Sequence, residues 1–141
     1  MHTEGVFAPE TAGAARERFE LVGPVAQTTV REVAKAMDFD REEYDRRVTA
    51  DVIATAREAI FASLLEVQVG SREAFEDWRD DHPDYDAEVI GSDNVDRVVW
   101  HGAPFAERVV AATFQDRESA AVGTLRRQAF GSVYRDVVAG E

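Results

Sequence analysis

The apolar residues in the first half of the chain recur every three to four positions, which is the period of an amphipathic helix. This pattern predicts one helix over residues 9–22, which Gly23 ends. It predicts a second helix over residues 24–37, because Pro24 suits the first turn of a helix. The apolar face of the second helix comprises Ala26, Val30, Val33, Ala34 and Met37.

Capping residues predict two more helices before the middle of the chain. Asp38 or Asp40 caps a short helix, because its side-chain oxygen accepts a hydrogen bond from a free backbone N–H group. Thr49 caps a longer helix that runs to about Leu64.

From residue 65 onward the spacing of apolar residues changes. Residues 65–69 alternate between apolar and polar, which predicts a half-buried strand, although residues 62–69 also fit the helical period. Ser71 then caps a helix that carries Phe75 and Trp78 and stops before Pro83. The same signals predict strands over residues 86–90, 95–101 and 106–114 and a last helix over residues 116–138. Because side chains alternate along a strand, we expect Val98 and Trp100 to face the helices, and Arg97 and His101 to lie on the more exposed side.

The predicted order is a set of helices followed by β-α-β-β-β-α. Consecutive strands joined by tight turns form antiparallel sheets. We therefore predict an α+β fold in which N-terminal helices precede a small antiparallel sheet of about three or four strands, with helices covering one face. The length fits a single domain over residues 1–141, with a helical part over 9–64 and a mixed part over 65–138.

The net charge of the chain indicates the salt concentration to which the protein is adapted. Against 28 Asp and Glu stand 16 basic residues, of which Lys35 is the only lysine, and the net charge is −12. In molar salt the screening length falls to about 3 Å, so that such a surface hardly repels itself. We therefore expect a halophilic, archaeal protein of a salt-rich cytoplasm.

Other features of the composition exclude several classes of protein. The chain has no cysteine, which rules out disulfides, zinc fingers and thiol nucleophiles. No apolar stretch approaches the roughly 18 residues of a membrane span, and the N-terminus lacks the pattern of a signal peptide. The expected location is cytoplasmic, with no membrane contact.

Histidine is the side chain best suited to acid–base catalysis near neutral pH, but no catalytic constellation surrounds any of the three. His101 follows Trp100 at the end of a predicted strand, and Phe105 lies in the turn beyond. These three residues form a candidate ligand pocket. In the alternative interpretation His101 only ends a strand and Trp100 belongs to the core. We predict no catalytic residue and no cofactor.

An acidic segment resembles part of a calcium-binding loop. Asp80, Asp84 and Asp86 supply oxygen ligands at even spacing. The sixth loop position is Tyr85 rather than glycine, and the twelfth is Gly91 rather than glutamate. The sequence therefore favours a solvated acidic loop, with no metal site beyond weak cation binding.

Residues 28–48 come close to the spacing of a helix-turn-helix, with Ala34 as the small residue of the first helix. Arg41, Arg46 and Arg47 would then face phosphates of DNA. The carboxylates interleaved with these arginines oppose such binding. We therefore predict no sequence-specific DNA binding and expect the short helix to pack within the bundle.

Four segments in the second half of the chain carry a resemblance. Residues 71–78 lead to 82–85, and residues 95–105 lead to 124–130. Together they resemble an uncharacterised haloarchaeal family of domains of unknown function. The resemblance supports the interpretation of the charge and implies no activity, ligand or catalytic residue.

These observations leave the biochemical function unknown and rank three hypotheses. The first is a non-enzymatic protein-interaction or structural module, partnered by itself or another protein, in which exposed sheet edges pair with a second copy. The second is a DNA-associated regulator that uses residues 28–48. The third is a small-ligand or enzymatic domain near Trp100 and Phe105.

Overall fold

A single long helix, rather than two, forms the N-terminal part of the protein. The structure, a computed structural model, describes residues 1–92 and 94–139. In it α1 (Ala12–Ala36) begins after Thr11 and runs through Gly23 and Pro24 without a break. The predicted boundary at Gly23 is therefore wrong. Proline inside a helix removes one backbone hydrogen bond, and burial of the apolar stripe of α1 offsets that loss.

The predicted caps of the next two helices are confirmed. Asp40 caps α2 (Arg41–Arg47), and Thr49 caps α3 (Ala50–Ser63), each through its side-chain oxygen. Between α1 and α2, Asp38 takes a left-handed backbone conformation with φ of 56°, which turns the chain. Because α3 ends before the strand that follows, residues 62–69 are divided between a helix end and a strand.

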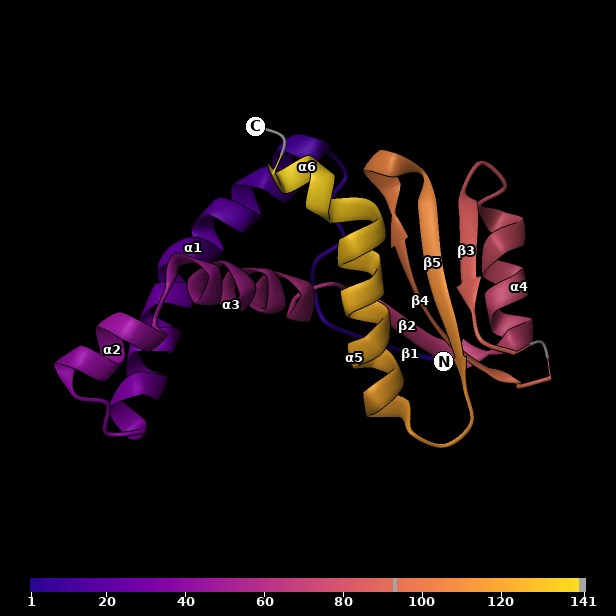
Figure 1. The fold of residues 1–141 in the computed structure, drawn as a ribbon. Coiled ribbons are helices and arrows are strands. Elements are labelled where there is room, and N and C mark those ends of the chain that lie inside the picture. Colours follow the sequence, from indigo (N-terminus) through magenta and orange to yellow (C-terminus); the bar gives the residue numbers. More distant parts are fainter. Residues whose placement is uncertain (93, 140–141) are drawn as a thin grey trace.

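Five strands of the described residues form one mixed sheet (Figure 1). They are β1 (His2–Glu4), β2 (Val67–Ser71), β3 (Asp86–Ile90), β4 (Arg97–Ala103) and β5 (Arg108–Phe114). Their order is β1-β2-β4-β5-β3, and every pair is antiparallel except β3 with β5, which is parallel. The α+β class is confirmed, whereas the prediction of three or four antiparallel strands is wrong. β1 was not predicted, and no pattern in the sequence indicates that β3 lies beside β5.

Helices cover both faces of the sheet, not one as predicted. α4 (Arg72–Asp81), which Ser71 caps as expected, lies on one face. On the other face lie α1, α3 and α5 (Glu118–Ala129). Figure 1 shows α4 on the far side of the sheet from α5.

The residues of β4 alternate between these two cores. Val98 and Trp100 pack against Phe75 of α4, so the prediction that they face a helix is confirmed. Val99 belongs to the larger core beneath α1, α3 and α5, and His101 contacts that core too. We expected the side of His101 to be exposed, which is wrong because helices cover that face as well.

The C-terminal helix contains one widened turn. α5 passes into a short η2 π-helix (Phe130–Tyr134), which continues as α6 (Arg135–Ala139). The residues that this stretch buries are Phe130, Val133, Tyr134 and Val138. A short η1 3₁₀-helix (Pro104–Ala106) joins β4 to β5.

The far half of the α1–α3 pair projects away from the sheet. We call residues 24–56 the helical arm and the remainder of the described chain the body. In Figure 1 the arm extends to one side of the sheet and ends in α2. Among the described residues, no helix combines the length and the hydropathy that a membrane span needs.

Candidate functional site

The helical arm carries an apolar groove of about 340 Å³. One wall comes from α1 and consists of Val30, Val33 and Ala34. Val52 and Ala56 of α3 form the opposite wall. The groove ends at Phe39, Arg47 and Val48, near the tip of the arm. We call this surface the arm groove.

The arm groove exists because the apolar stripe of α1 extends beyond the part of the helix that is buried against the rest of the protein. The stripe repeats every three or four residues and comprises Phe19, Val22, Ala26, Val30, Val33 and Met37. Its members nearer the body are buried, as at Val22 and Ala26. Nearer the tip of the arm, Val33 is 52% exposed and Met37 is 59% exposed. Apolar side chains at core spacing but in contact with solvent mark a surface that lacks a partner.

At the tip of the arm, α2 presents the candidate DNA-binding residues. Arg41, Arg46 and Arg47 are all exposed, and α2 buries no residue. The Arg47 guanidinium lies 5.4 Å from the centroid of the Phe39 ring and so closes the arm groove. The expectation that α2 packs within the bundle is therefore wrong, since only two residues, Val48 and Thr49, separate α2 from α3 and hold it at the tip.

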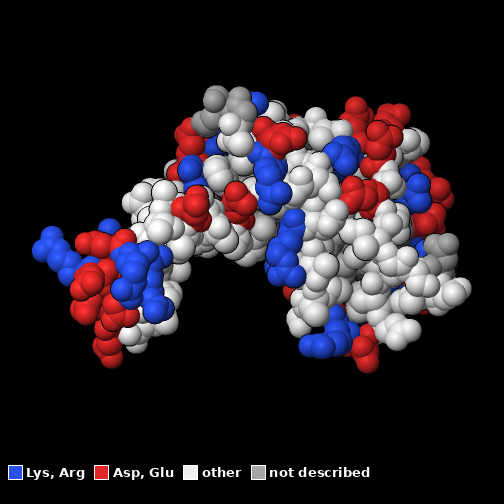
Figure 2. All heavy atoms as spheres, in the orientation of Figure 1, with Lys and Arg blue, Asp and Glu red and all other residues white. Residues whose placement is uncertain are grey.

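The arm carries charges of both signs. It holds five basic and seven acidic side chains, hence a net charge of −2. The basic residues are Arg31, Lys35, Arg41, Arg46 and Arg47. Figure 2 shows basic and acidic side chains side by side at the tip of the arm. A surface of this kind can pair with a copy of itself, because each sign can meet the opposite one.

The candidate pocket residues do not share a cavity. Trp100 and His101 are both buried and point to opposite faces of the sheet. Phe105 lies on the side of His101, with its ring centroid 5.6 Å from that of Tyr134. Because the sheet separates Trp100 from the other two, one ligand cannot contact all three.

His101 forms a buried hydrogen-bonded pair with Tyr134, which was not predicted from the sequence. Its Nδ1–H donates to the Glu66 carbonyl at 2.6 Å, and the Tyr134 hydroxyl donates to Nε2 at 2.6 Å. A carbonyl only accepts, so Nδ1 carries the proton and Nε2 is the acceptor. Burial lowers the pKa of His101 from 6.5 to about 4 and raises the pKa of Tyr134. The His101 ring is therefore neutral, and both of its nitrogens are hydrogen-bonded. The buried pair is enclosed by the core, which it stabilises.

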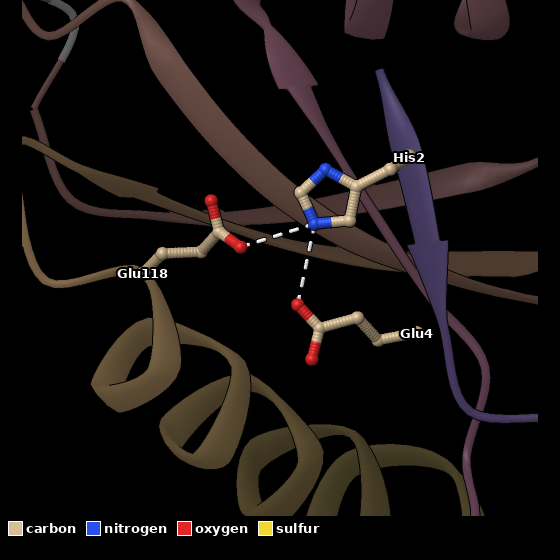
Figure 3. Close-up of side chains that lie close together, drawn as sticks. All are labelled: His2, Glu4 and Glu118. Carbon is tan, nitrogen blue, oxygen red and sulfur yellow. Dashed lines mark hydrogen bonds and ion pairs between the residues drawn. The ribbon is translucent and has the colours of Figure 1, made fainter.

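One cluster of metal-ligating groups occurs among the described residues (Figure 3). Nε2 of His2 lies 3.3 Å from a Glu4 carboxylate oxygen and 3.0 Å from a Glu118 oxygen. All three side chains are substantially exposed, and Nη2 of Arg97 lies 3.3 Å from the other Glu118 oxygen. That guanidinium already supplies a positive charge next to the carboxylates, in the place of a metal ion. We therefore interpret the cluster as a structural contact that links β1 to the start of α5.

The three aspartates of the calcium-like segment do not converge. Asp80 lies in α4, Asp84 in the connecting turn and Asp86 in β3. Among residues 1–92 and 94–139, only the cluster around His2 brings three ligand atoms within 4.8 Å of one another. The weak cation site therefore gains no support from the geometry.

Comparison with known proteins places the chain in a family without assigning it an activity. No curated protein and no solved structure matches it. A family model described as a family of unknown function matches residues 6–135, which includes the arm, strands β2 to β5 and the buried His101–Tyr134 pair. The chain belongs to this family of unknown function, DUF5809.

Proposed function

We propose that the protein is a non-enzymatic interaction module that binds a second copy of itself through the arm groove. The observation that carries this proposal is the exposed continuation of the α1 stripe, where Val33 lines the arm groove and Met37 follows one turn later, both more than half exposed. Burial of such residues in an interface is favourable by roughly 25 cal/mol per Å².

A second copy fits the groove better than an unrelated partner for two reasons. The arm offers an exposed side chain, Met37, one helical turn beyond Val33 of the groove, so that two arms related by a two-fold axis can each fill the groove of the other. The mixed charges of the arm allow carboxylates of one copy to lie opposite arginines of the other. High salt would screen the remaining repulsion and strengthen apolar contact.

The sheet edges are weaker candidates than the arm. β1 offers three residues, and the outer strand β3 carries Asp86 and Glu88. Short and charged edge strands resist pairing with another sheet. We therefore propose self-association through the arm groove instead of through the sheet edges, which were the surface expected from the sequence.

A matched pair of substitutions on α1 tests the proposal. Val33 lines the groove and is 52% exposed, whereas Val25, two turns earlier, is 51% exposed and lies outside it. Val33→Asp should weaken the dimer by about 100-fold or more, because an unpaired carboxylate would be buried in the interface. Val25→Asp adds the same charge to the same helix and should leave dimerisation unchanged.

Analytical ultracentrifugation in about 2 M KCl measures both variants against the parent chain. The expected parent is a dimer at micromolar concentrations. A parent chain that stays monomeric up to about 1 mM, or equal weakening by both substitutions, would sink the proposal.

A DNA-associated regulator is the second candidate, and the position of α2 favours it. An exposed helix with Arg41, Arg46 and Arg47 at the end of a projecting arm could reach a phosphate backbone. Glu42 and Asp45 share that exposed surface and oppose phosphate binding. The exposed position of α2 favours DNA binding, whereas the carboxylates on the same surface oppose it.

A titration with sheared genomic DNA from about 0.2 to about 2 M KCl separates the two candidates. We expect no binding at the upper end, because the few arginines are offset by carboxylates and gain little from counterion release. Submicromolar binding at high salt that vanishes in the Arg46→Ala, Arg47→Ala double variant would promote the regulator instead.

We also propose that the protein is adapted to a salt-rich, haloarchaeal cytoplasm. The support is the excess of 28 acidic over 16 basic residues and the single lysine. The midpoint of thermal unfolding should rise steadily from dilute buffer to molar KCl, because screening removes self-repulsion from the compact state. Differential scanning calorimetry checks this, and a flat or falling midpoint would contradict the proposal.

A further inference from the structure

A second cavity lies at the inner corner where the arm meets the body. It has a volume of about 370 Å³ and is formed by α1, α3 and the C-terminal helical segment. Its apolar lining includes Phe19, Ile53, Phe130 and Val138. This volume is within the range of small-molecule sites, which are concave and mainly apolar with a few polar groups.

The most informative polar group in this corner cavity is Arg57. Its Nε donates to the Phe19 carbonyl at 2.9 Å, and its guanidinium carbon lies 4.0 Å from the centroid of the Phe19 ring. These contacts hold the half-buried side chain in one orientation. Among the described residues, no carboxylate lies within ion-pair distance of it, although the chain has 28 acidic residues.

The surroundings of Arg57 are locally basic. Arg135 also lines the cavity, with its guanidinium 5.4 Å from the Phe130 ring centroid, and pairs with Glu58 at 3.5 Å. A neighbouring hollow of about 160 Å³ shares Glu58, Phe130 and Arg135 and is lined by Arg127 as well. Figure 2 shows basic side chains in this part of the surface, with acidic side chains beside them. Three arginines and one glutamate give an excess of positive charge on a protein whose net charge is −12.

We propose that the corner cavity binds a small organic carboxylate with an aromatic or branched apolar body. The carboxylate would pair with the remaining N–H groups of Arg57, since a pre-oriented guanidinium matches the geometry of a carboxylate. The apolar body would contact Phe19, Ile53 and Phe130. Both parts of the ligand are needed to match the cavity. A small anion would make no contact with the apolar lining, and a neutral apolar molecule would leave Arg57 without an ion pair.

Binding of three probes to the full chain tests this proposal by NMR titration at high salt. Benzoate has both parts, acetate lacks the apolar body, and benzyl alcohol lacks the charge. We expect benzoate to bind with a Kd below about 1 mM and each of the others at least about tenfold more weakly. The aromatic resonances of Phe19 and Phe130 should shift with benzoate.

Three variants locate the site. Arg57→Gln should weaken benzoate binding at least about tenfold, since it removes the ion pair. Arg57 also joins α3 to α1, so its replacement could affect folding, and a second variant is needed. Ala54 is exposed and lines the cavity. Ala54→Phe should therefore fill the cavity and abolish benzoate binding. Arg46→Gln, at the tip of the arm, removes the same charge elsewhere and should change nothing.

Two outcomes would overturn the proposal. One is the absence of benzoate binding to the parent chain below about 10 mM. The other is binding that survives both Arg57→Gln and Ala54→Phe, which would place benzoate elsewhere. The result is separate from self-association, because Val33→Asp alters the arm groove and should bind benzoate like the parent chain.

Discussion

Replacing Trp100 with alanine should lower the free energy of unfolding by about 3–5 kcal/mol, the largest effect that we expect from a single substitution. The indole is fully buried between β4 and α4, where its ring centroid lies 5.2 Å from that of Phe75. Alanine would leave a cavity that the sheet backbone cannot close. Urea unfolding followed by far-ultraviolet circular dichroism measures the loss.

A second substitution at the same position separates packing from hydrogen bonding. Nε1 of Trp100 is buried and has no partner among the described residues. Trp100→Phe keeps much of the apolar volume and removes this unsatisfied donor, so it should cost less than half as much as Trp100→Ala. Equal losses from the two variants, or free quenching of the Trp100 indole by acrylamide, would show that its environment is not the one described here.

The free energy of unfolding should fall by about 3 kcal/mol as the pH drops from 6.5 to 4, because of His101 alone. Burial, aided by the nearby Arg126 charge, lowers the pKa of His101 to about 4, although the bond to the Glu66 carbonyl partly opposes this shift. Between these pH values the unfolded chain binds a proton that the folded chain does not. The stability contribution is therefore complete above pH 6.5 and is lost toward pH 4.

His101→Gln isolates this effect from the many carboxylates, which titrate in both proteins. The difference in unfolding free energy between the parent and this variant should shrink as the pH falls through that window. If the difference stays constant between pH 7 and pH 4, His101 does not have the lowered pKa that its enclosure causes. Tyr134→Phe provides a further check, because loss of the hydroxyl leaves Nε2 unsatisfied and should cost about 1–3 kcal/mol.

Local chemistry made several parts of the fold predictable. Asp40, Thr49 and Ser71 were identified as caps because a side-chain oxygen before a helix acts within three residues. The alternation along β4 likewise indicated that Val98 and Trp100 share a face. Such signals depend only on neighbours in sequence.

Features that depend on distant contacts were missed. Pro24 suggested a helix start, but packing of the stripe of α1 on α3 keeps the helix continuous. Three residues were too few to predict β1, which exists because it pairs with β2. The arm groove was hidden for the opposite reason: Val33 and Met37 have core spacing, and nothing in the sequence shows that the core ends before them.

The strand order has a consequence for how the chain folds. In the described part of the chain, β4 and β5 are the one pair of neighbouring strands joined by a short connection, and the other pairs join segments separated by longer stretches of chain. β3 must wait for β5, and β1 must wait for β2, so the sheet cannot be completed until Phe114 has been synthesised. Non-local pairing of this kind slows folding. The arm, built from neighbouring helices, depends on local contacts and can form on the ribosome well before the sheet closes.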